Sequence, residues 1–552
     1  MTFRRSQHGP LVSILISTYN RPQYLAEALE SIFRQTWPHL QVVLVRDGGA
    51  DVEEVVRRFD DRRLTFINRA ENRGLPYSFN EALAHARGEY ICYLGDDDKF
   101  YPHHVQRLVE AIESQDRCGA VYSDLYKVHC RVKPDGRRIA LAKNLEISRD
   151  FDRMLMLQFN HVLHVSVMHR KDLLERAGGY NENLNVLIDW DLNRKLCFYT
   201  DFLHVPQITG EYYGPVGECD RISVQRRKNV QDYLRNVLTI RTTRPPKPWP
   251  CVEDLSVLVL AERADALLEQ TLRDLWSHTF YPQQIYVALS PEQASGWRPA
   301  VPNVVVVPAE PASSLEKRVD RMLAVCEGAY TALVPTGLAA EMDEAAWLER
   351  SLCPLLECRQ PYQAFELVEA TETCWGAVFR TEELRRVRRQ YGHLPLRASL
   401  QAGGFSVRKP KFEEYPFRFD HFLAAAEQVQ QEGDWGYAAQ IYAYLAEHFG
   451  NGLWMRTRQA HALIQAGRCG EALQVLEPVL SVRPTVSGLM LAARIYQKQK
   501  NYRRAIEFYE QARRVVEGTE VQRRWIPPIR RKAVKPAADE PEMSTEESRV
   551  WT

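Results

Sequence analysis

Apolar and polar positions fall into blocks along the first hundred residues. Four continuous apolar runs occupy residues 11–17, 40–45, 64–67 and 89–94. Runs of this length without alternation are typical of strands that are buried on both faces of a sheet. The segment after the first run instead spaces its apolar residues as a helix does, at Leu25, Leu29 and Ile32. Strands that alternate with helices predict an α/β domain with a parallel sheet.

Polar side chains gather where these predicted strands end. Ser17–Asn20 follows the first run, Asp47 the second and Asp96–Asp98 the fourth. In open α/β sheets, ligands bind in the crevice outside the carboxyl ends of the strands. The sequence therefore predicts a binding site at this edge of the sheet.

A second stretch of chain repeats the pattern of the first. After the proline-rich linker 242–250, the run 255–260 resembles 11–16 and aligns Ser256 with Ser13. Three further pairs preserve the match: Thr36 with Thr279, Gly88-Glu89-Tyr90 with Gly328-Ala329-Tyr330, and Val167–Arg170 with Ala377–Arg380. We interpret residues 1–245 and 251–415 as two copies of one fold; chance similarity between two βαβ units is the alternative.

The chain changes character near residue 420, where helical patterning takes over. Ala439, Ala472 and Ala505 recur at intervals of 33 residues, and Gly433 and Gly467 lie 34 apart. A period near 34 with paired helices resembles the tetratricopeptide repeat. Such repeats are predicted over residues 420–518, and a disordered tail rich in charge and proline over 519–552.

Composition excludes several classes of protein. The 552 residues contain 72 Lys and Arg against 71 Asp and Glu, a formal net charge of +1, so the chain lacks the basic field that nucleic-acid binding requires. No apolar run approaches the roughly 20 residues of a membrane span, and the first ten residues do not read as a signal peptide. The eleven cysteines include no CxxC pair. We expect a cytoplasmic protein whose thiols are reduced. The protein itself would be either free in the cytoplasm or bound peripherally at the inner face of the membrane.

The acids Asp96, Asp97 and Asp98 are the strongest candidates for chemistry. Side chains alternate along a strand, so Asp96 and Asp98 are expected to face the same side. Hard cations such as Mg²⁺ and Mn²⁺ prefer carboxylate oxygens and keep substrate phosphates among their other ligands. A solvated acidic turn is the alternative interpretation.

An ordered set of motifs now identifies a resemblance. Residues 11–215 resemble a family-2 glycosyltransferase with the GT-A, nucleotide-sugar-binding fold. The matching pieces are Ser17-Thr18-Tyr19-Asn20-Arg21, Asp47-Gly48-Gly49, Asn72-Arg73-Gly74, Asn80, Ala86–Tyr90, Leu94–Asp98 with Pro102, Gly178-Gly179-Tyr180 and Ile188–Asp191.

The resemblance implies a metal-dependent transfer from a nucleotide-sugar donor, most simply a UDP-sugar, to the hydroxyl of a glycan or protein acceptor in cell-envelope glycan biosynthesis. It implies Mg²⁺ or Mn²⁺ on Asp98 and Asp96, and Asp189 as the general base of an inverting single displacement. The implied donor-binding residues are Thr18, Tyr19, Asn20, Arg21, Asp47, Asn72, Gly74, Asn80, Asp96 and Asp97.

Several positions depart from the family pattern or leave alternatives open. Asp191 competes with Asp189 for the role of base, although an acid there also stabilises the start of a helix. Ile188 and Arg46 replace acids that are common in the family. The basic residues Arg221 and Arg226 would contact the diphosphate or form a solvated turn, and His161 and His164 would lie in the core or in an acceptor groove. A retaining outcome and a nucleotide other than UDP also stay open.

The second copy lacks the acids of the first. Residues 335–338 read Pro-Thr-Gly-Leu where the first copy has its aspartates, and residues 393–401 contain no acid. The second domain is therefore expected to be catalytically silent, and the repeats to bind a protein partner. The alternative from a different class is a non-catalytic scaffold that uses all three parts for binding.

Overall fold

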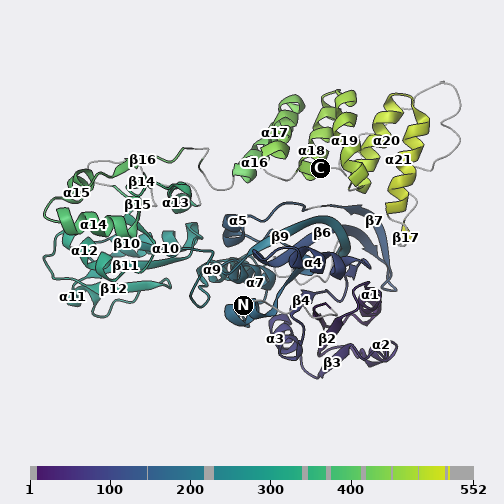
Figure 1. Ribbon diagram of the computed structural model, residues 1–552, viewed down its shortest axis with the longest axis horizontal. Helices are drawn as coiled ribbons and strands as arrows, with labels where there is room; N and C mark the ends of the chain where they lie inside the picture. Colours follow the sequence, from purple (N-terminus) through teal and green to yellow (C-terminus); the bar gives the residue numbers. More distant parts are fainter. Residues whose placement is uncertain are drawn as a thin grey trace.

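The computed structural model describes residues 9–145, 147–216, 229–338, 346–367, 375–411, 414, 418–448, 452–482, 484–515 and 520–521. Figure 1 shows three parts: an α/β domain that contains the first sheet, a second α/β domain beside it, and a row of helices along one side of the first.

The first domain is built on one curled sheet. Its strands are β1 (Val12–Thr18), β2 (Leu40–Asp47), β3 (Leu64–Arg69), β4 (Tyr90–Tyr93), β5 (Lys99–Phe100), β6 (Cys118–Val132), β7 (Arg138–Asn144), β8 (Val167–Arg170) and β9 (Asp201–Pro215). The order is β7-β6-β8-β4-β1-β2-β3, with β9 beside β6 and the short β5 beside β9. Strands β3, β2, β1 and β4 are parallel, whereas β8 runs antiparallel to both β4 and β6. The expected parallel core is therefore confirmed.

Helices cover both faces of this sheet. They are α1 (Pro22–Phe33), α2 (Glu53–Arg57), α3 (Leu75–His85), α4 (His104–Glu113), α5 (Arg153–Gln158), α6 (Lys171–Ala177), α7 (Ile188–Leu196) and α9 (Val230–Thr242). Alternate residues of β1 enter different cores: Ile14 packs in one with Leu25 of α1, and Leu15 in the other with Phe79 of α3. Burial on both faces explains why the strands read as continuous apolar runs.

The second domain contains a sheet of the same design. Its strands are β10 (Leu255–Leu260), β11 (Gln283–Leu289), β12 (Val304–Pro308), β13 (Tyr330–Pro335), β14 (Gln363–Glu366), β15 (Ala377–Arg380) and β16 (Ser406–Arg408), and its helices are α10 (Ala266–His278), α11 (Pro291–Ala294), α12 (Leu315–Val325), α13 (Trp347–Glu357), α14 (Thr381–Tyr391) and α15 (Leu396–Ala402). The order β12-β11-β10-β13-β15-β14-β16 repeats β3-β2-β1-β4-β8-β6-β9, with the same parallel and antiparallel pairs.

Individual contacts repeat as well as strand order. The Gly88 N–H donates to the Ser13 hydroxyl at 2.8 Å, and the Gly328 N–H donates to the Ser256 hydroxyl at 3.0 Å. A Cβ at either glycine would lie within 2.6 Å of the backbone nitrogen of its serine partner. The serine and glycine positions that align in the sequence thus make the same close contact in both sheets.

The C-terminal part consists of three helix pairs. They are α16 (Arg418–Gln431) with α17 (Trp435–His448), α18 (Gly452–Gln465) with α19 (Cys469–Val482), and α20 (Val486–Lys498) with α21 (Tyr502–Val515). The turn within each pair contains a residue with positive φ: Gly433, Gly467 and Lys500. These turns recur every 33 or 34 residues, so the period seen in the sequence corresponds to the repeat of the helix pairs. Most of the predicted tail lies outside the described residues, and Glu520–Val521 forms β17, which pairs with β7.

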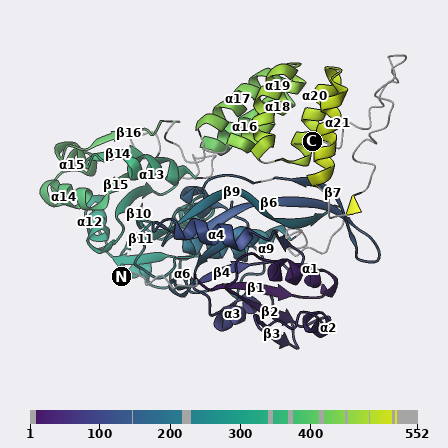
Figure 2. The ribbon, with the colours of Figure 1, turned by 45° about the vertical axis from the view of Figure 1, so that its right-hand side comes forward.

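The second domain and the helix pairs each pack against the first domain. One apolar core contains Trp190 and Phe198 from the first domain together with Leu255 and Trp347 from the second. The helix pairs lie along β6 and β7 in both views (Figures 1 and 2), where the Tyr126 hydroxyl donates to the Pro484 carbonyl. Within the described ranges, no helix has the length and apolar character needed to cross a membrane.

Candidate active site

The three aspartates form a turn at the carboxyl end of β4. The Thr18 hydroxyl, at the end of β1, donates to Asp96 Oδ2 at 2.8 Å. Arg21 Nη1 donates to Asp97 Oδ2 at 2.9 Å and lies 3.5 Å from Asp96 Oδ1. The predicted site residues Thr18, Arg21, Asp96 and Asp97 therefore meet, because β1 and β4 are neighbours in the sheet.

The structure corrects the argument from strand alternation. Strand β4 ends at Tyr93, and Asp98 N–H bonds to Gly95 O at 3.2 Å, so the acids lie on a turn rather than on a strand. Asp98 Oδ1 accepts a hydrogen bond from the Tyr213 N–H on β9 at 3.0 Å, whereas Asp96 contacts Thr18 on β1. A shared metal on Asp96 and Asp98 stays a prediction.

The electrostatics of the turn suit a cation. Burial, followed by the charge of Asp97, raises the pKa of Asp96 to about 7, and Arg21 and Thr18 act in the opposite direction. A bound cation would act in the same direction as Arg21 and favour the carboxylate form of Asp96. The described residues contain no convergent group of three His, Cys, Asp or Glu side chains. The oxygen donors of the turn fit Mg²⁺ or Mn²⁺ of the kind held by one or two carboxylates and completed by substrate phosphates.

Asp47 organises the loop that precedes α3. Its carboxylate accepts hydrogen bonds from the Arg73 N–H at 2.8 Å, the Gly74 N–H at 2.9 Å and Arg69 Nη1 at 2.7 Å. The Asn72 side chain also donates to the Asp47 carbonyl at 3.1 Å. Asp47 is 3% exposed, so these contacts already occupy a buried carboxylate. The predicted residues Asp47, Asn72 and Gly74 do meet, in a loop that is held from within.

The turn after β2 lies against the loop after β1. Asn20 Oδ1 accepts from the Ala50 N–H at 2.8 Å, and a Cβ at Gly49, where φ is +73°, would overlap Asn20 Oδ1. Arg46, which replaces an acid common in the resembled family, donates to the Ala50 carbonyl at 2.9 Å and so stabilises the same turn. Tyr19 is 46% exposed beside it, which leaves an aromatic face open to a ligand.

Asn80 joins α3 to the loop before α7. Its Oδ1 accepts from the Tyr180 N–H at 2.9 Å, and its Nδ2 donates to the Tyr180 carbonyl at 3.0 Å and to Glu182 Oε1 at 2.9 Å. The predicted role of Asn80 in donor binding stays a prediction. In the structure its amide holds the Gly178–Tyr180 segment, which leads into the helix with the candidate base.

The two candidate bases differ in their surroundings. Asp189 lies in the first turn of α7 and is partly exposed, and its Oδ2 accepts from Asn160 Nδ2 at 2.8 Å. Asp191 is 1% exposed and lies 2.7 Å from Lys195 Nζ. Only the partly exposed carboxylate can reach a substrate hydroxyl, which favours Asp189.

Contacts and short stretches of chain connect Asp189 to the end of β4. Tyr93, three residues before Asp96, stacks on His164 with ring centroids 4.2 Å apart. His164 follows Asn160 by four residues, and Asn160 contacts Asp189. His164 bonds to the Tyr180 hydroxyl at 2.7 Å, and desolvation lowers its pKa to about 3, so this partly buried ring is neutral.

His161, in contrast, is buried in the core. Its Nε2 accepts from the Asp152 N–H at 3.2 Å, and burial lowers its pKa to about 3. The nearby His204 differs, because its ring nitrogens each lie 2.9 Å from a carboxylate oxygen, of Asp124 and of Asp150. Burial opposes the charged ring, but these two carboxylates raise the pKa of His204 above its usual value.

Some predicted site residues lie outside the described ranges, and some residues at the site were not predicted. Arg221 and Arg226 lie outside the described residues. Arg138 on β7 had no signal in the sequence: its guanidinium lies over the rings of Tyr213, at 3.6 Å, and Tyr24, at 4.4 Å, and donates to the Asp97 carbonyl. Asn160 was also missed, because only the fold brings it to Asp189.

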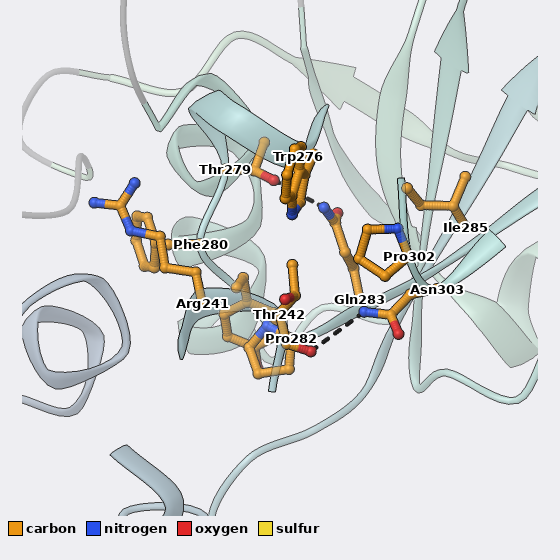
Figure 3. Close-up of a pocket in the computed structure, with 11 residues that line it drawn as sticks. Arg241, Thr242, Trp276, Thr279, Phe280, Pro282, Gln283, Ile285, Pro302 and Asn303 are labelled. Carbon is orange, nitrogen blue, oxygen red and sulfur yellow. Dashed lines mark hydrogen bonds between the residues drawn. The ribbon is translucent and has the colours of Figure 1, made fainter. Parts of the chain in front are cut away.

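A separate cavity lies at the junction of the two α/β domains (Figure 3). It is lined by the end of α9, by the end of α10 and the segment after it, and by the amino-terminal ends of β11 and β12. Gln283 Nε2 donates to Thr279 Oγ1 at 2.8 Å, and Asn303 Nδ2 donates to the Thr242 carbonyl at 3.3 Å. This cavity lies at the amino-terminal ends of β11 and β12, opposite the carboxyl ends of that sheet, and none of the candidate site residues lines it.

Comparison with known proteins gives a family match in the first domain. The family model described as Glycosyl transferase family 2 matches residues 13–174. The match includes the acid turn and ends before Asp189.

Three relatives each match part of this chain. The chain is 32% identical over 224 residues to Protein CgeD of Bacillus subtilis, covering 37% of this chain and 50% of CgeD. It is 31% identical over 180 residues to the uncharacterized glycosyltransferase YwdF of the same organism, covering 33% of this chain and 65% of YwdF. It is 28% identical to the chondroitin synthase of Pasteurella multocida, covering 41% of this chain and 22% of the synthase. The chain thus spans less than two thirds of the length of these relatives.

Solved structures show more distant likeness. The S. aureus TarS fragment 1–349 in complex with UDP-GlcNAc is 18% identical, with a TM-score of 0.34, over 42% of this chain and 66% of TarS 1–349. The mannosyltransferase PcManGT of Pyrobaculum calidifontis in complex with GDP-Man and Mn²⁺ is 22% identical, with a TM-score of 0.32, over 43% of this chain and 66% of PcManGT.

Proposed function

We propose that this protein is a metal-dependent glycosyltransferase that moves a sugar from a nucleotide-sugar donor to an acceptor hydroxyl with inversion. The observation that carries the proposal is the meeting of the acid turn, Thr18 and Arg21 at one edge of the sheet, with Asp189 linked to that edge through Asn160 and His164. The family match over residues 13–174 supports the same reaction class.

The donor would lie along the carboxyl ends of β1, β2 and β4. Asp96 and Asp98 would hold Mg²⁺ or Mn²⁺, which supplies neutralisation of charge on the departing diphosphate. Tyr19 would offer its exposed aromatic face to the base of the nucleotide, and the Arg21 guanidinium lies beside the aspartates of the turn. The carboxylate of Asp47 acts on the donor indirectly, since it shapes the loop that contains Asn72 and Gly74.

Asp189 would remove the proton from the acceptor hydroxyl as that oxygen attacks the anomeric carbon. One carboxylate is sufficient, because attack from the side opposite the leaving nucleotide inverts the anomeric centre without a covalent intermediate. Asn160 occupies Oδ2 of this carboxylate. Asp191, buried against Lys195, stabilises the helix instead.

The other two parts would serve binding and support. We infer that the second domain is a copy of the first that has lost its site, because the strand order and the serine–glycine contact recur while residues 335–338 and α15 contain no acid. The three helix pairs resemble tetratricopeptide repeats and would bind the acceptor or a protein partner in the cytoplasm.

The test is a screen of UDP- and GDP-sugars with Mn²⁺ or Mg²⁺, read as release of the nucleoside diphosphate and as thermal stabilisation. Asp189→Asn should lower turnover by about 10²–10⁴-fold while donor binding is retained, because only the base is removed. Asp172→Asn, an exposed acid in the first turn of α6, is the matched control and should keep full activity. If no donor binds with either metal, the protein is a non-catalytic scaffold and the proposed enzyme function is wrong. If Asp189→Asn keeps full activity, Asp189 is not the general base.

A further inference from the structure

Arg194, on the helix that contains Asp189, is completely buried, and its guanidinium donates to backbone carbonyls. Its Nε donates to the Leu157 carbonyl at 3.2 Å and its Nη1 to the Thr243 carbonyl at 2.7 Å. Its Nη2 donates to the carbonyls of Arg241 at 2.6 Å and Phe280 at 3.4 Å. One guanidinium therefore joins α7 to three separate segments of chain.

Two of these carbonyls belong to the end of α9. The last carbonyls of a helix have no partner within it, and a cation near them is favourable. Helix α9 ends at Thr242, so Arg194 satisfies the Arg241 and Thr243 carbonyls at that point. The chain then passes directly into the linker that leads to the second domain.

The third segment belongs to the second domain itself. Phe280 follows α10, and its carbonyl accepts from Arg194 while its N–H donates to Glu349 Oε1 at 2.7 Å. The Tyr281 N–H donates to the same oxygen at 2.8 Å. Glu349 lies on α13 and is fully buried. The Phe280 backbone is thus held between a carboxylate of the second domain and the guanidinium of α7.

Apolar packing makes this connection rigid. Trp190, Leu192 and Leu196 of α7 share one continuous core with Leu255 and Trp347 of the second domain. Relative motion of two domains is the usual expectation unless their interface is extensive and apolar, and this shared core supplies apolar contact across the interface. A displacement of the second domain would therefore move α7.

We propose that the second α/β domain positions the candidate base, with Arg194 as the positioning residue that holds α7 in place. This inference rests on the proposed function. Asp189 and Arg194 lie on the same nine-residue helix, so a shift of the helix at Arg194 displaces the carboxylate at its start. Misplacement of a reacting group by 1 Å can cost about 10²-fold in rate.

The experiment compares Arg194→Met with Arg318→Met in the full chain. Arg318 is the matched control, because it is also buried and donates to backbone carbonyls, of Ala261 at 2.7 Å and Glu262 at 2.8 Å, but only within the second domain. Arg194→Met should lower kcat by about 10- to 100-fold with the donor KM unchanged, whereas Arg318→Met should keep kcat. Arg194→Lys, which keeps the charge and some of the carbonyl bonds, should recover part of the loss.

A second measurement separates this inference from the proposed function. Hydrogen exchange at the start of α7, read by mass spectrometry, should accelerate in Arg194→Met and not in Arg318→Met. If the wild-type protein turns over no donor, the proposed function fails, and exchange alone decides the positioning role. Unchanged exchange at residues 188–191 in Arg194→Met, or equal loss of kcat in both variants, would overturn the inference. Arg194→Lys supplies the same comparison where Arg194→Met does not fold.

Discussion

Asp47 is predicted to support the fold at least as much as it supports donor binding. Asp47→Asn keeps the shape of the side chain and replaces one carboxylate oxygen by an NH₂ group. The two oxygens now face three donors, the N–H groups of Arg73 and Gly74 and the Arg69 guanidinium. In the variant, the new NH₂ group faces at least one of these donors, and that hydrogen bond is lost.

The magnitude follows from the kind of bond removed. A hydrogen bond to a charged group contributes about 1.5–3 kcal/mol. For a domain of 150–250 residues, 1 kcal/mol shifts Tm by about 2–4 °C, so Asp47→Asn should lower Tm by about 3–12 °C. Thermal unfolding without any nucleotide is the assay, because a residue that acts only on the donor would leave this Tm unchanged.

Asp61→Asn supplies the comparison. Asp61 also pairs with an arginine, Arg63 at 2.7 Å, but on a partly exposed turn within the same domain. A partly exposed pair contributes about 0–1 kcal/mol, so its loss should shift Tm by no more than a few degrees. If Asp47→Asn retains the wild-type Tm and loses only donor affinity, the structural account of Asp47 is wrong.

Three further predictions concern other parts of the chain. His204→Gln should lower stability chiefly at acid pH, since a raised pKa means that the charged pair stabilises the fold below pH 6.5 and is lost as pH rises through the raised value; urea unfolding from pH 5.5 to 9 checks this. Gly88→Ala and Gly328→Ala should each cost about 1–3 kcal/mol in urea unfolding, because a Cβ at either position meets backbone within 2.6 Å; a neutral effect at both would refute the shared contact. Asn160→Ala should lower kcat by about tenfold and leave the donor Kd unchanged in steady-state kinetics and calorimetry, because it removes one hydrogen bond to Asp189.

The parallel strands were predictable because burial on both faces leaves a direct trace in the sequence. Strand β10 was predicted at its observed bounds, Leu255–Leu260, and β2 at its observed start, Leu40. The conformation of the acid turn was not predictable from alternation, since the strand ends at Tyr93 and backbone bonding takes over. Contacts such as Arg138 with the Asp97 carbonyl depend on a hairpin that folds back from more than forty residues away, and no local pattern encodes them.

The two sheets allow residues needed for the fold to be separated from residues needed for chemistry. The serine–glycine contact is present in both, and so is an arginine over the tyrosine that begins the central strand, Arg170 over Tyr90 and Arg380 over Tyr330. These contacts hold strands together, and a sheet without a site still requires them. Strand register places Ser290 where the first sheet has Asp47, and the Ser290 hydroxyl accepts from the Gln293 N–H in a capping box. Asp47 instead accepts from the loop before α3, so the second sheet keeps a side-chain acceptor at this position but neither its charge nor its hydrogen-bond partners. The positions of Asp96, Asp97 and Asp98 have no acidic counterpart in the second sheet, as expected for residues whose cost is balanced only by a ligand.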